Sequence, residues 1–172
     1  MKIILIVAVC KGNLGIGMEN DLLWHLPADM KFFKETTIGY PVITGRKNYE
    51  SIPEKFRPLQ GRENIIITRD TNYKAKGAVI CNSILQALKE AQRIGKEKCF
   101  VIGGGQIYEQ FLALNIVDEV LISWVDTTIN ADTFFKGFNS ENWESKIILK
   151  KEKDAKNEFS FNIVKYTRKF AS

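Results

Sequence analysis

The chain has 172 residues, of which 45% are hydrophobic and 26% are charged, an ordinary composition for a folded globular protein. Three cysteines without CxxC spacing and a single histidine argue against a disulfide framework and a zinc site, so we expect a cytoplasmic protein without a metal. The formal net charge of +5 suits polyanionic ligands, but no nucleic-acid-binding motif accompanies it, and we expect no nucleic-acid partner.

The apolar run over residues 2–10 is too short to span a bilayer and predicts a buried strand, so we expect no membrane partner. A glycine-containing loop is expected over 11–25 and a helix over 27–37. Pro27 suits the first position of that helix, and Gly39 is a plausible stop. Beyond it, strands are predicted over 41–44, 64–68, 78–80 and 98–102, and helices over 46–51, 83–94 and 106–114.

The C-terminal part changes character, because strand-like segments follow one another without helices between them. They cover residues 117–125, 143–151 and 159–169, and the last two predict an antiparallel hairpin. Strands that alternate with helices imply a largely parallel sheet covered on both faces. The sequence therefore predicts a single α/β domain over residues 1–172, with a mixed, mainly parallel sheet flanked by helices and an antiparallel C-terminal hairpin.

The helix over 27–37 carries one carboxylate, Asp29, in its first turn. Spacings of three and four residues place Asp29 on the same face as Leu26, Met30 and Phe33. An ionised carboxylate on an apolar face is costly unless the protein or a ligand satisfies it. Two interpretations are open from this segment alone: a residue that caps its own helix, or a functional carboxylate.

Two junctions between strands and helices have features of anion-binding sites, and ligands of open α/β sheets gather at the carboxyl ends of strands. At the first, Arg46 and Lys47 follow Gly45 at the start of a helix, where a bound anion would balance their charge. Thr68 and Arg69, past the end of another strand, could bind the same phosphate monoester. The alternative is that these cations are simply solvated.

The second junction is the triple glycine over residues 103–105, between a strand and a helix. Three glycines let the backbone approach a ligand closely, and a pyrophosphate would fit there. This run is neither GxGxxG nor a Walker loop, and a tight structural turn would also explain it. A pyrophosphate site beside a monoester site favours NADPH over NADH.

Several motifs, in the same order and spacing, make the chain resemble dihydrofolate reductase along nearly its full length. They are Gly15-Ile16-Gly17-Met18-Glu19-Asn20, Trp24-His25-Leu26-Pro27-Ala28-Asp29, Gly45-Arg46-Lys47, Val101-Ile102-Gly103-Gly104-Gly105-Gln106-Ile107-Tyr108-Glu109, and Asp132-Thr133 before Phe134.

The resemblance implies an oxidoreductase that transfers a hydride from NADPH to C6 of 7,8-dihydrofolate, with a proton delivered to N5, and so supplies tetrahydrofolate for one-carbon metabolism and thymidylate synthesis. Asp29 would accept hydrogen bonds from N3 and the 2-amino group of the pteridine, and a water near Trp24 and Leu22 would donate the proton. Arg62 would bind the glutamate α-carboxylate, and Ser123 would support Asp29. A cis peptide is implied between Gly103 and Gly104.

By the same resemblance, three groups of residues are expected to form the site. The catalytic group is Asp29, Leu22 and Trp24. The substrate-binding group is Val7, Ala8, Asp29, Met30, Phe33, Ile52, Leu59, Arg62, Ile102, Tyr108 and Ser123. The cofactor-binding group is Ala8, Ile16, Gly17, Gly45, Arg46, Lys47, Asn48, Thr68, Arg69, Ile102, Gly103, Gly104, Gly105, Gln106, Ile107 and Tyr108.

Four residues depart from what is usual in this family. Leu23 replaces a proline, Thr44 an apolar residue, Asn48 a threonine, and Tyr49 a tryptophan or phenylalanine. The hydroxyl of Thr44, at the end of a buried strand, needs a partner. None of these changes removes a catalytic group.

We further expect a monomer, with diaminopyrimidine and pteridine antifolates as inhibitors. Two other functions are compatible with parts of the sequence: a pyrimidine reductase of riboflavin synthesis, and a noncatalytic module that binds nucleotides or nucleic acid.

Overall fold

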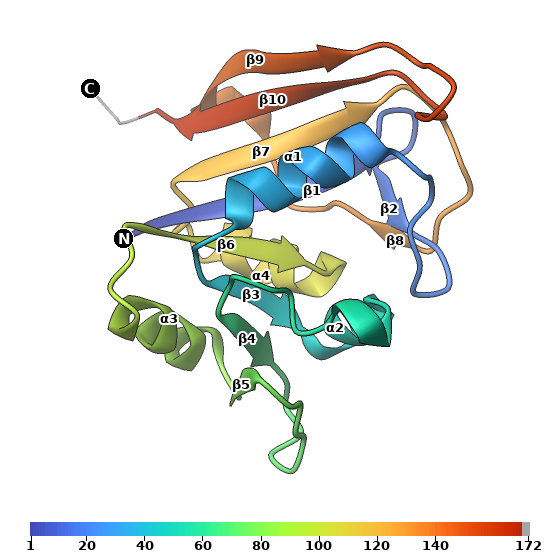
Figure 1. The fold of residues 1–172 in the computed structure, drawn as a ribbon. Coiled ribbons are helices and arrows are strands. Elements are labelled where there is room, and N and C mark those ends of the chain that lie inside the picture. Colours follow the sequence, from blue (N-terminus) through green and yellow to red (C-terminus); the bar gives the residue numbers. More distant parts are fainter. Residues whose placement is uncertain (170–172) are drawn as a thin grey trace.

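A computed structural model of the chain describes residues 1–169, and within them a twisted eight-stranded sheet forms the centre of the molecule (Figure 1). The strand order is β5-β4-β3-β6-β1-β7-β10-β9. The pairs from β5 to β7 are parallel, whereas β10 is antiparallel to both β7 and β9, as predicted. The strands are β1 (Lys2–Cys10), β3 (Val42–Gly45), β4 (Asn64–Ile67), β5 (Ala78–Cys81), β6 (Lys98–Gly103), β7 (Glu119–Val125), β9 (Trp143–Lys151) and β10 (Phe161–Arg168).

Helices cover both faces of this sheet. They are α1 (Pro27–Thr37), α2 (Arg46–Ser51), α3 (Ile84–Arg93) and α4 (Gly105–Ala113), with short 3-10 turns at η1 (Glu54–Phe56) and η2 (Ser140–Asn142). Figure 1 shows α1 crossing in front of the sheet over β1 and β7. No helix within residues 1–169 is long and apolar enough to cross a membrane.

Alternating side chains of β1 divide the core between the two faces. Ile4 and Ile6 pack in a cluster with Phe33 of α1, whereas Leu5 and Val7 belong to a larger cluster with residues of α3 and α4. A central strand that is apolar on both sides is what a parallel sheet between two helical layers requires. This arrangement leaves the carboxyl ends of the parallel strands free to form a binding site.

One prediction from the sequence is wrong in detail, because residues 11–25 are not all loop. Gly15–Gly17 forms the short strand β2, which pairs antiparallel with β8, Thr133–Phe134. A three-residue strand is too short for an alternating pattern, and its partner lies more than a hundred residues further along the chain. The pairing fixes the loop before α1 against the segment that follows β7.

The buried side chains of β10 alternate between the two faces of the sheet, but its pairing with β9 is irregular. Phe161 and Ile163 face the cluster that holds Leu26, whereas Val164 and Tyr166 face the larger cluster. The register with β9 shifts after Ile163, because Ile163 lies opposite Leu149 whereas Val164 lies opposite Ile147, which leaves Ile148 of β9 as an extra residue. An extra residue of this kind is a β-bulge, and it bends the strand.

Candidate active site

A cleft with a volume of about 2060 Å³ lies at the carboxyl ends of the parallel strands. A pocket for one small ligand typically measures roughly 300–1,000 Å³, so this cleft has room for two ligands side by side. Helix α1 forms one wall, and the segments that begin α2 and α4 form the other. The structure thus brings together the strand ends at which the sequence predicted a site.

Almost all the residues expected at the site line this one cleft. The expected catalytic and substrate-binding residues among them are Val7, Ala8, Leu22, Trp24, Asp29, Met30, Phe33, Ile52, Leu59, Arg62, Ile102, Tyr108 and Ser123. The expected cofactor-binding residues are Ile16, Gly17, Gly45, Arg46, Lys47, Asn48, Thr68, Arg69, Gly104, Gly105, Gln106 and Ile107, together with Ala8, Ile102 and Tyr108.

Gly103 is the exception, because it does not line the cleft. It is buried as the last residue of β6, with a φ of +120°. A Cβ atom on Gly103 would come within 3.1–3.2 Å of the Tyr108 ring, and its carbonyl accepts a hydrogen bond from Thr44. Gly103 therefore packs inside the protein, and the peptide that joins it to Gly104 is cis, as expected.

The Asp29 carboxylate stands at the centre of the cleft wall. Its Oδ1 accepts a hydrogen bond of 2.5 Å from Ser123 Oγ on β7, across the gap between α1 and the sheet. Burial raises the pKa of Asp29 above its usual 3.8, and the hydrogen bond from Ser123 opposes that rise. Within residues 1–169 its Oδ2 receives no hydrogen bond, so it remains available to a ligand that brings N–H donors.

Asp29 does not cap its own helix, so that interpretation of the sequence is wrong. The N-cap residue of α1 is Leu26, which has no side-chain acceptor. Asn157, in the hairpin between β9 and β10, accepts a hydrogen bond of 3.0 Å from the Ala28 amide instead. Asn157 is buried and is held by Asp154 Oδ1, which accepts from its amide and its side chain at 2.8 and 3.0 Å.

The contacts between the β9–β10 hairpin and the start of α1 were not predicted from the sequence. Glu158 accepts a 2.9 Å hydrogen bond from the His25 amide, beside the contact that Asn157 makes. Lys151 forms a 2.9 Å ion pair with Asp154. This cation makes the largest contribution to lowering the pKa of the Asp154 carboxyl well below its usual range. The only local signal is the spacing of three between Asp154 and Asn157, which resembles many surface turns.

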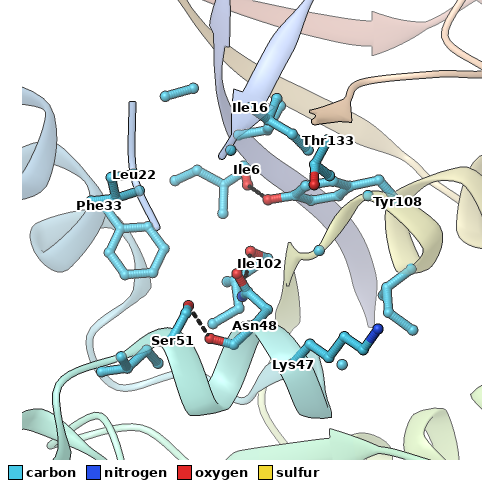
Figure 2. Close-up of a pocket in the computed structure, with 18 of the residues that line it drawn as sticks. Ile6, Ile16, Leu22, Phe33, Lys47, Asn48, Ser51, Ile102, Tyr108 and Thr133 are labelled. Carbon is cyan, nitrogen blue, oxygen red and sulfur yellow. Dashed lines mark hydrogen bonds between the residues drawn. The ribbon is translucent and has the colours of Figure 1, made fainter. Parts of the chain in front are cut away.

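Tyr108, from α4, approaches the same region from the opposite side of the cleft. Its hydroxyl donates a 2.7 Å hydrogen bond to the Ile6 carbonyl of β1 (Figure 2). Burial, with a contribution from the charge on Asp29, raises the pKa of Tyr108 far above its usual 10. The phenol therefore stays neutral, and its proton is committed to the backbone of β1.

Arg62 lies toward the outer end of the cleft, over the face of the Phe33 ring at 6.0 Å from its centroid. It donates to Gln60 O at 3.0 Å and to Thr37 Oγ1 at 3.1 Å. Burial lowers its pKa, but a guanidinium stays charged in proteins. Its remaining N–H donors can bind a carboxylate.

The buried Asn64 side chain shapes the turn that carries Arg62. Its Oδ1 accepts from Leu59 N at 2.8 Å, and its Nδ2 donates to the carbonyls of Leu59 and Arg62 at 3.0 and 2.9 Å. The start of β4 thereby fixes two residues that line the cleft.

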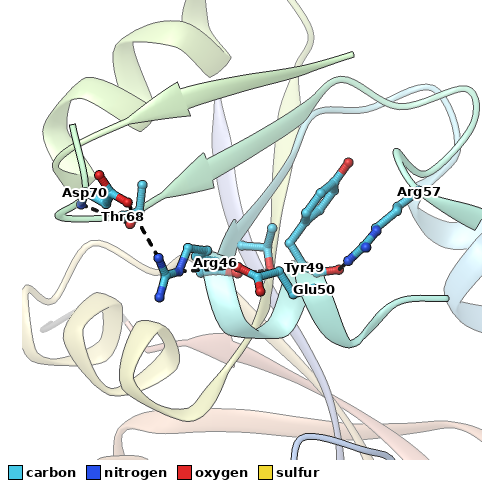
Figure 3. A network of polar contacts seen from close by, with 8 residues as sticks. Arg46, Tyr49, Glu50, Arg57, Thr68 and Asp70 are labelled. Atoms are coloured by element: carbon cyan, nitrogen blue, oxygen red, sulfur yellow. Dashed lines mark hydrogen bonds and ion pairs between the residues drawn. The ribbon is translucent and has the colours of Figure 1, made fainter. Parts of the chain in front are cut away.

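At the other end of the cleft, Arg46 is already paired with carboxylates. Figure 3 shows its guanidinium between Glu50 Oε1, 3.4 Å from Nε, and Asp70 Oδ2, 3.7 Å from Nη1. It also lies 5.6 Å from the centroid of the Tyr73 ring. The sequence did not predict these partners, which orient Arg46. Lys47 and Arg69 form no ion pair within the described part of the chain.

Gly104 and Gly105 meet different neighbours. A Cβ on Gly105 would lie 2.9 Å from Thr133 Cγ2 of β8, so packing alone requires glycine there. A Cβ on Gly104 would meet only Asn48 Cβ, at 3.8 Å. Protein packing thus leaves space beside Gly104, and this space opens on the cleft.

The described residues 1–169 contain no group of His, Cys, Asp and Glu that could hold a metal ion.

The burial of Asp29 predicts that Asp29→Asn is more stable than the wild type at neutral pH. Above the folded-state pKa the folded protein carries an ionised, partly desolvated carboxylate. Below pH 3.8 the carboxyl is protonated in both the folded and the unfolded state, so the cost of desolvating its charge disappears. The advantage of the variant should amount to about 1.4 kcal/mol for each unit by which the pKa is raised.

Urea unfolding of both proteins between pH 7 and pH 4 measures this difference. The gain in the free energy of unfolding should shrink as the pH falls toward 4. A difference that does not change with pH would show that Asp29 does not titrate above its ordinary pKa.

Comparison with known proteins agrees with this geometry. A family model described as dihydrofolate reductase matches residues 2–168. Dihydrofolate reductase type 3 of Salmonella typhimurium is 37% identical over 168 residues, 98% of this chain and 99% of the relative. Dihydrofolate reductase of Neisseria meningitidis serogroup A is 42% identical over 141 residues, 82% of this chain and 83% of the relative.

A solved structure of dihydrofolate reductase from Enterococcus faecalis, complexed with NADP(H) and RAB-propyl, superposes with a TM-score of 0.87. It is 29% identical in sequence, and the match covers 97% of this chain and 96% of that chain. With a family match over nearly its whole length, the chain belongs to the dihydrofolate reductase family.

Proposed function

We propose that the protein reduces 7,8-dihydrofolate to 5,6,7,8-tetrahydrofolate with NADPH as the hydride donor. The observation that carries this proposal is the Asp29–Ser123 pair, a half-buried carboxylate in a family member whose cleft has room for two ligands. A flat heterocycle with two adjacent N–H groups matches the carboxylate as a bidentate donor. The same match would recognise diaminopyrimidine and pteridine antifolates.

The substrate half of the cleft is built around this pairing. Ser123 holds one oxygen of Asp29 and thereby orients the carboxylate toward the ring. Phe33, Ile52 and Leu59 provide apolar wall beyond it, and Arg62 provides a charged end for a carboxylate of the substrate. The cleft thus offers a folate one anion, Asp29, for its pteridine and one cation, Arg62, for its glutamate.

Asp29 also supports protonation of the substrate. An ionised carboxylate close to the pteridine favours the form of the ring system that carries an additional proton. Leu22, 64% exposed, and Trp24 stand at the mouth of the cleft, where they can limit the approach of water to that position. We assign the immediate proton donation to a water there.

The cofactor half of the cleft fits NADPH. Bound there, NADPH supplies the hydride. Arg46, Lys47 and Arg69 offer cations for phosphate groups, and Thr68 offers a hydroxyl. The open space beside Gly104 allows close approach of a pyrophosphate, while Ile16 and Ile102 provide apolar surface for the nicotinamide.

The proposed site needs no second chain, since all its residues come from one chain, and we propose a monomer. We also propose a cytoplasmic location, supported by three buried cysteines that are all free. Light scattering on the purified protein measures its molar mass and so tests whether it is a monomer.

Mixing the protein with NADPH and dihydrofolate, and following cofactor oxidation by absorbance, tests the function. We expect loss of NADPH only when dihydrofolate is present. NADPH that binds but is not oxidised in the presence of dihydrofolate would leave only a binding function and would refute the proposal.

Asp29→Asn should keep the fold and NADPH binding but lower turnover at neutral pH by roughly 10²–10⁴, the usual range for lost acid–base assistance. Turnover should recover in part at acidic pH, where the solvent supplies protonated substrate. Asp126→Asn, the same change at an exposed residue beyond β7, is the matched control and should match the wild type. Wild-type turnover in Asp29→Asn at pH 7 would remove Asp29 from the mechanism.

Arg46→Ala should weaken NADPH binding by about 10- to 100-fold, the effect of losing charge-assisted hydrogen bonds to a phosphate. NADH lacks that phosphate, so its affinity should change much less. Arg57→Ala is the control, because Arg57 stacks 5.7 Å from the Tyr49 ring outside the cleft. Equal losses for the two cofactors on titration of Arg46→Ala would rule out its role at the 2′-phosphate.

A further inference from the structure

A partly buried hydrogen-bond network joins the end of β3 to α2 and to the end of β6. Asn48 Nδ2 donates to Thr44 Oγ1 at 3.0 Å and to Ile102 O at 3.2 Å. Thr44 Oγ1, on a residue 1% exposed, donates to Gly103 O at 3.1 Å. Both side chains are therefore tied to the two carbonyls that precede Gly104, and Figure 2 shows Asn48 beside Ile102.

The carbonyls fix the direction of every hydrogen bond in this network. Ile102 O can only accept, so the amide nitrogen of Asn48, not its oxygen, must face it. The hydroxyl of Thr44 has one proton, and its possible acceptors are the carbonyls of Gly103 at 3.1 Å and Gly45 at 3.3 Å. Since that proton is committed to a carbonyl, Thr44 must accept from Asn48. Neither side chain can reverse without losing its partner.

The network connects the two segments that border the cofactor half of the cleft. Asn48 lies in α2, one residue beyond Lys47, and Ile102 and Gly103 lead directly into Gly104, the N-cap residue of α4. No other side chain of α2 bonds to β6 within the described residues. The distance between the cations of α2 and the glycine turn therefore depends on this pair of side chains.

We infer that Thr44 and Asn48 are a coupled pair of positioning residues, which hold α2 and the glycine turn at the separation that NADPH requires. The inference rests on the proposed function and deepens it. Neither residue takes part in the chemistry. The pair sets the affinity for the dinucleotide, whereas the Asp29–Ser123 contact of the substrate half joins α1 to β7.

The two residues share one hydrogen bond, so their replacements should not act independently. Thr44→Val removes the acceptor of Asn48 and the donor to Gly103. Asn48→Leu, of similar size, removes the donor to Thr44 and to Ile102. Each change should raise the dissociation constant of NADPH about fivefold to tenfold. The double variant should show less than a third of the product of the two effects, because the shared bond can be lost only once.

Titration with NADPH, followed by quenching of protein fluorescence, gives the four dissociation constants of this cycle. Binding of a diaminopyrimidine without cofactor is measured on the same proteins, and turnover at saturating NADPH is measured on Thr44→Val, because Thr44 does not line the cleft. Both should stay within about twofold of the wild type. Thr44→Ser keeps the hydroxyl and should restore wild-type affinity, which guards against a Val variant that fails to fold. Thr167→Val, on the exposed side of β10, is the matched control.

The inference is overturned if the two effects multiply in full, or if diaminopyrimidine binding weakens as much as NADPH binding. These outcomes would leave the proposed function intact. A wild-type protein that does not bind NADPH would overturn both.

Discussion

The structure depends on one polar contact across an apolar gap, the hydrogen bond from Ser123 on β7 to Asp29 on α1. A carboxylate that is largely removed from water is tolerated only where it is paired or where a ligand completes its shell. Ser123 satisfies one oxygen and leaves the other open to the cleft. The burial that makes Asp29 destabilising in the free protein also makes it selective. A ligand with two N–H donors replaces the hydrogen bonds from water that the carboxylate loses on burial. The burial of Asp29 therefore lowers the stability of the free protein and favours the binding of a matching ligand.

The surrounding fold keeps that contact in place with elements distant in sequence. The hairpin between β9 and β10 supplies Asn157, which holds the first turn of α1 where Leu26 offers no cap. Tyr108 is held against β1 by its hydrogen bond to the Ile6 carbonyl, so its proton is not available to the substrate. On the cofactor side, Thr44 and Asn48 connect α2 to the glycine turn. Each half of the cleft thus has its own supports, which allows affinity for one ligand to change without the other.

Local signals in the sequence predicted most elements and the place of the cleft. Pro27 and the spacing of Asp29 from Phe33 predicted α1, and the rule for strand ends in open sheets predicted where the two halves meet. Long-range contacts were not predictable: β2 pairs with β8, Arg46 forms an ion pair with Asp70, and Asn157 accepts a hydrogen bond from the Ala28 amide. Gly103 was expected at the cofactor, but its neighbours in space, Tyr108 and Thr44, bury it. The need of Thr44 for a partner was foreseen, whereas the identity of that partner required the structure.

The central claim is that Asp29 is a half-buried carboxylate whose hydrogen bonding is completed by its ligand, and a carbon-13 NMR titration of its carboxyl group tests it directly. In the free protein the resonance should titrate above 3.8, because burial disfavours the charged form. With a diaminopyrimidine bound, the carboxyl should remain ionised across that same range, because the paired N–H donors stabilise the charge. A carboxyl that titrates at or below 3.8 in the free protein, or whose titration does not change when the ligand binds, would contradict the account.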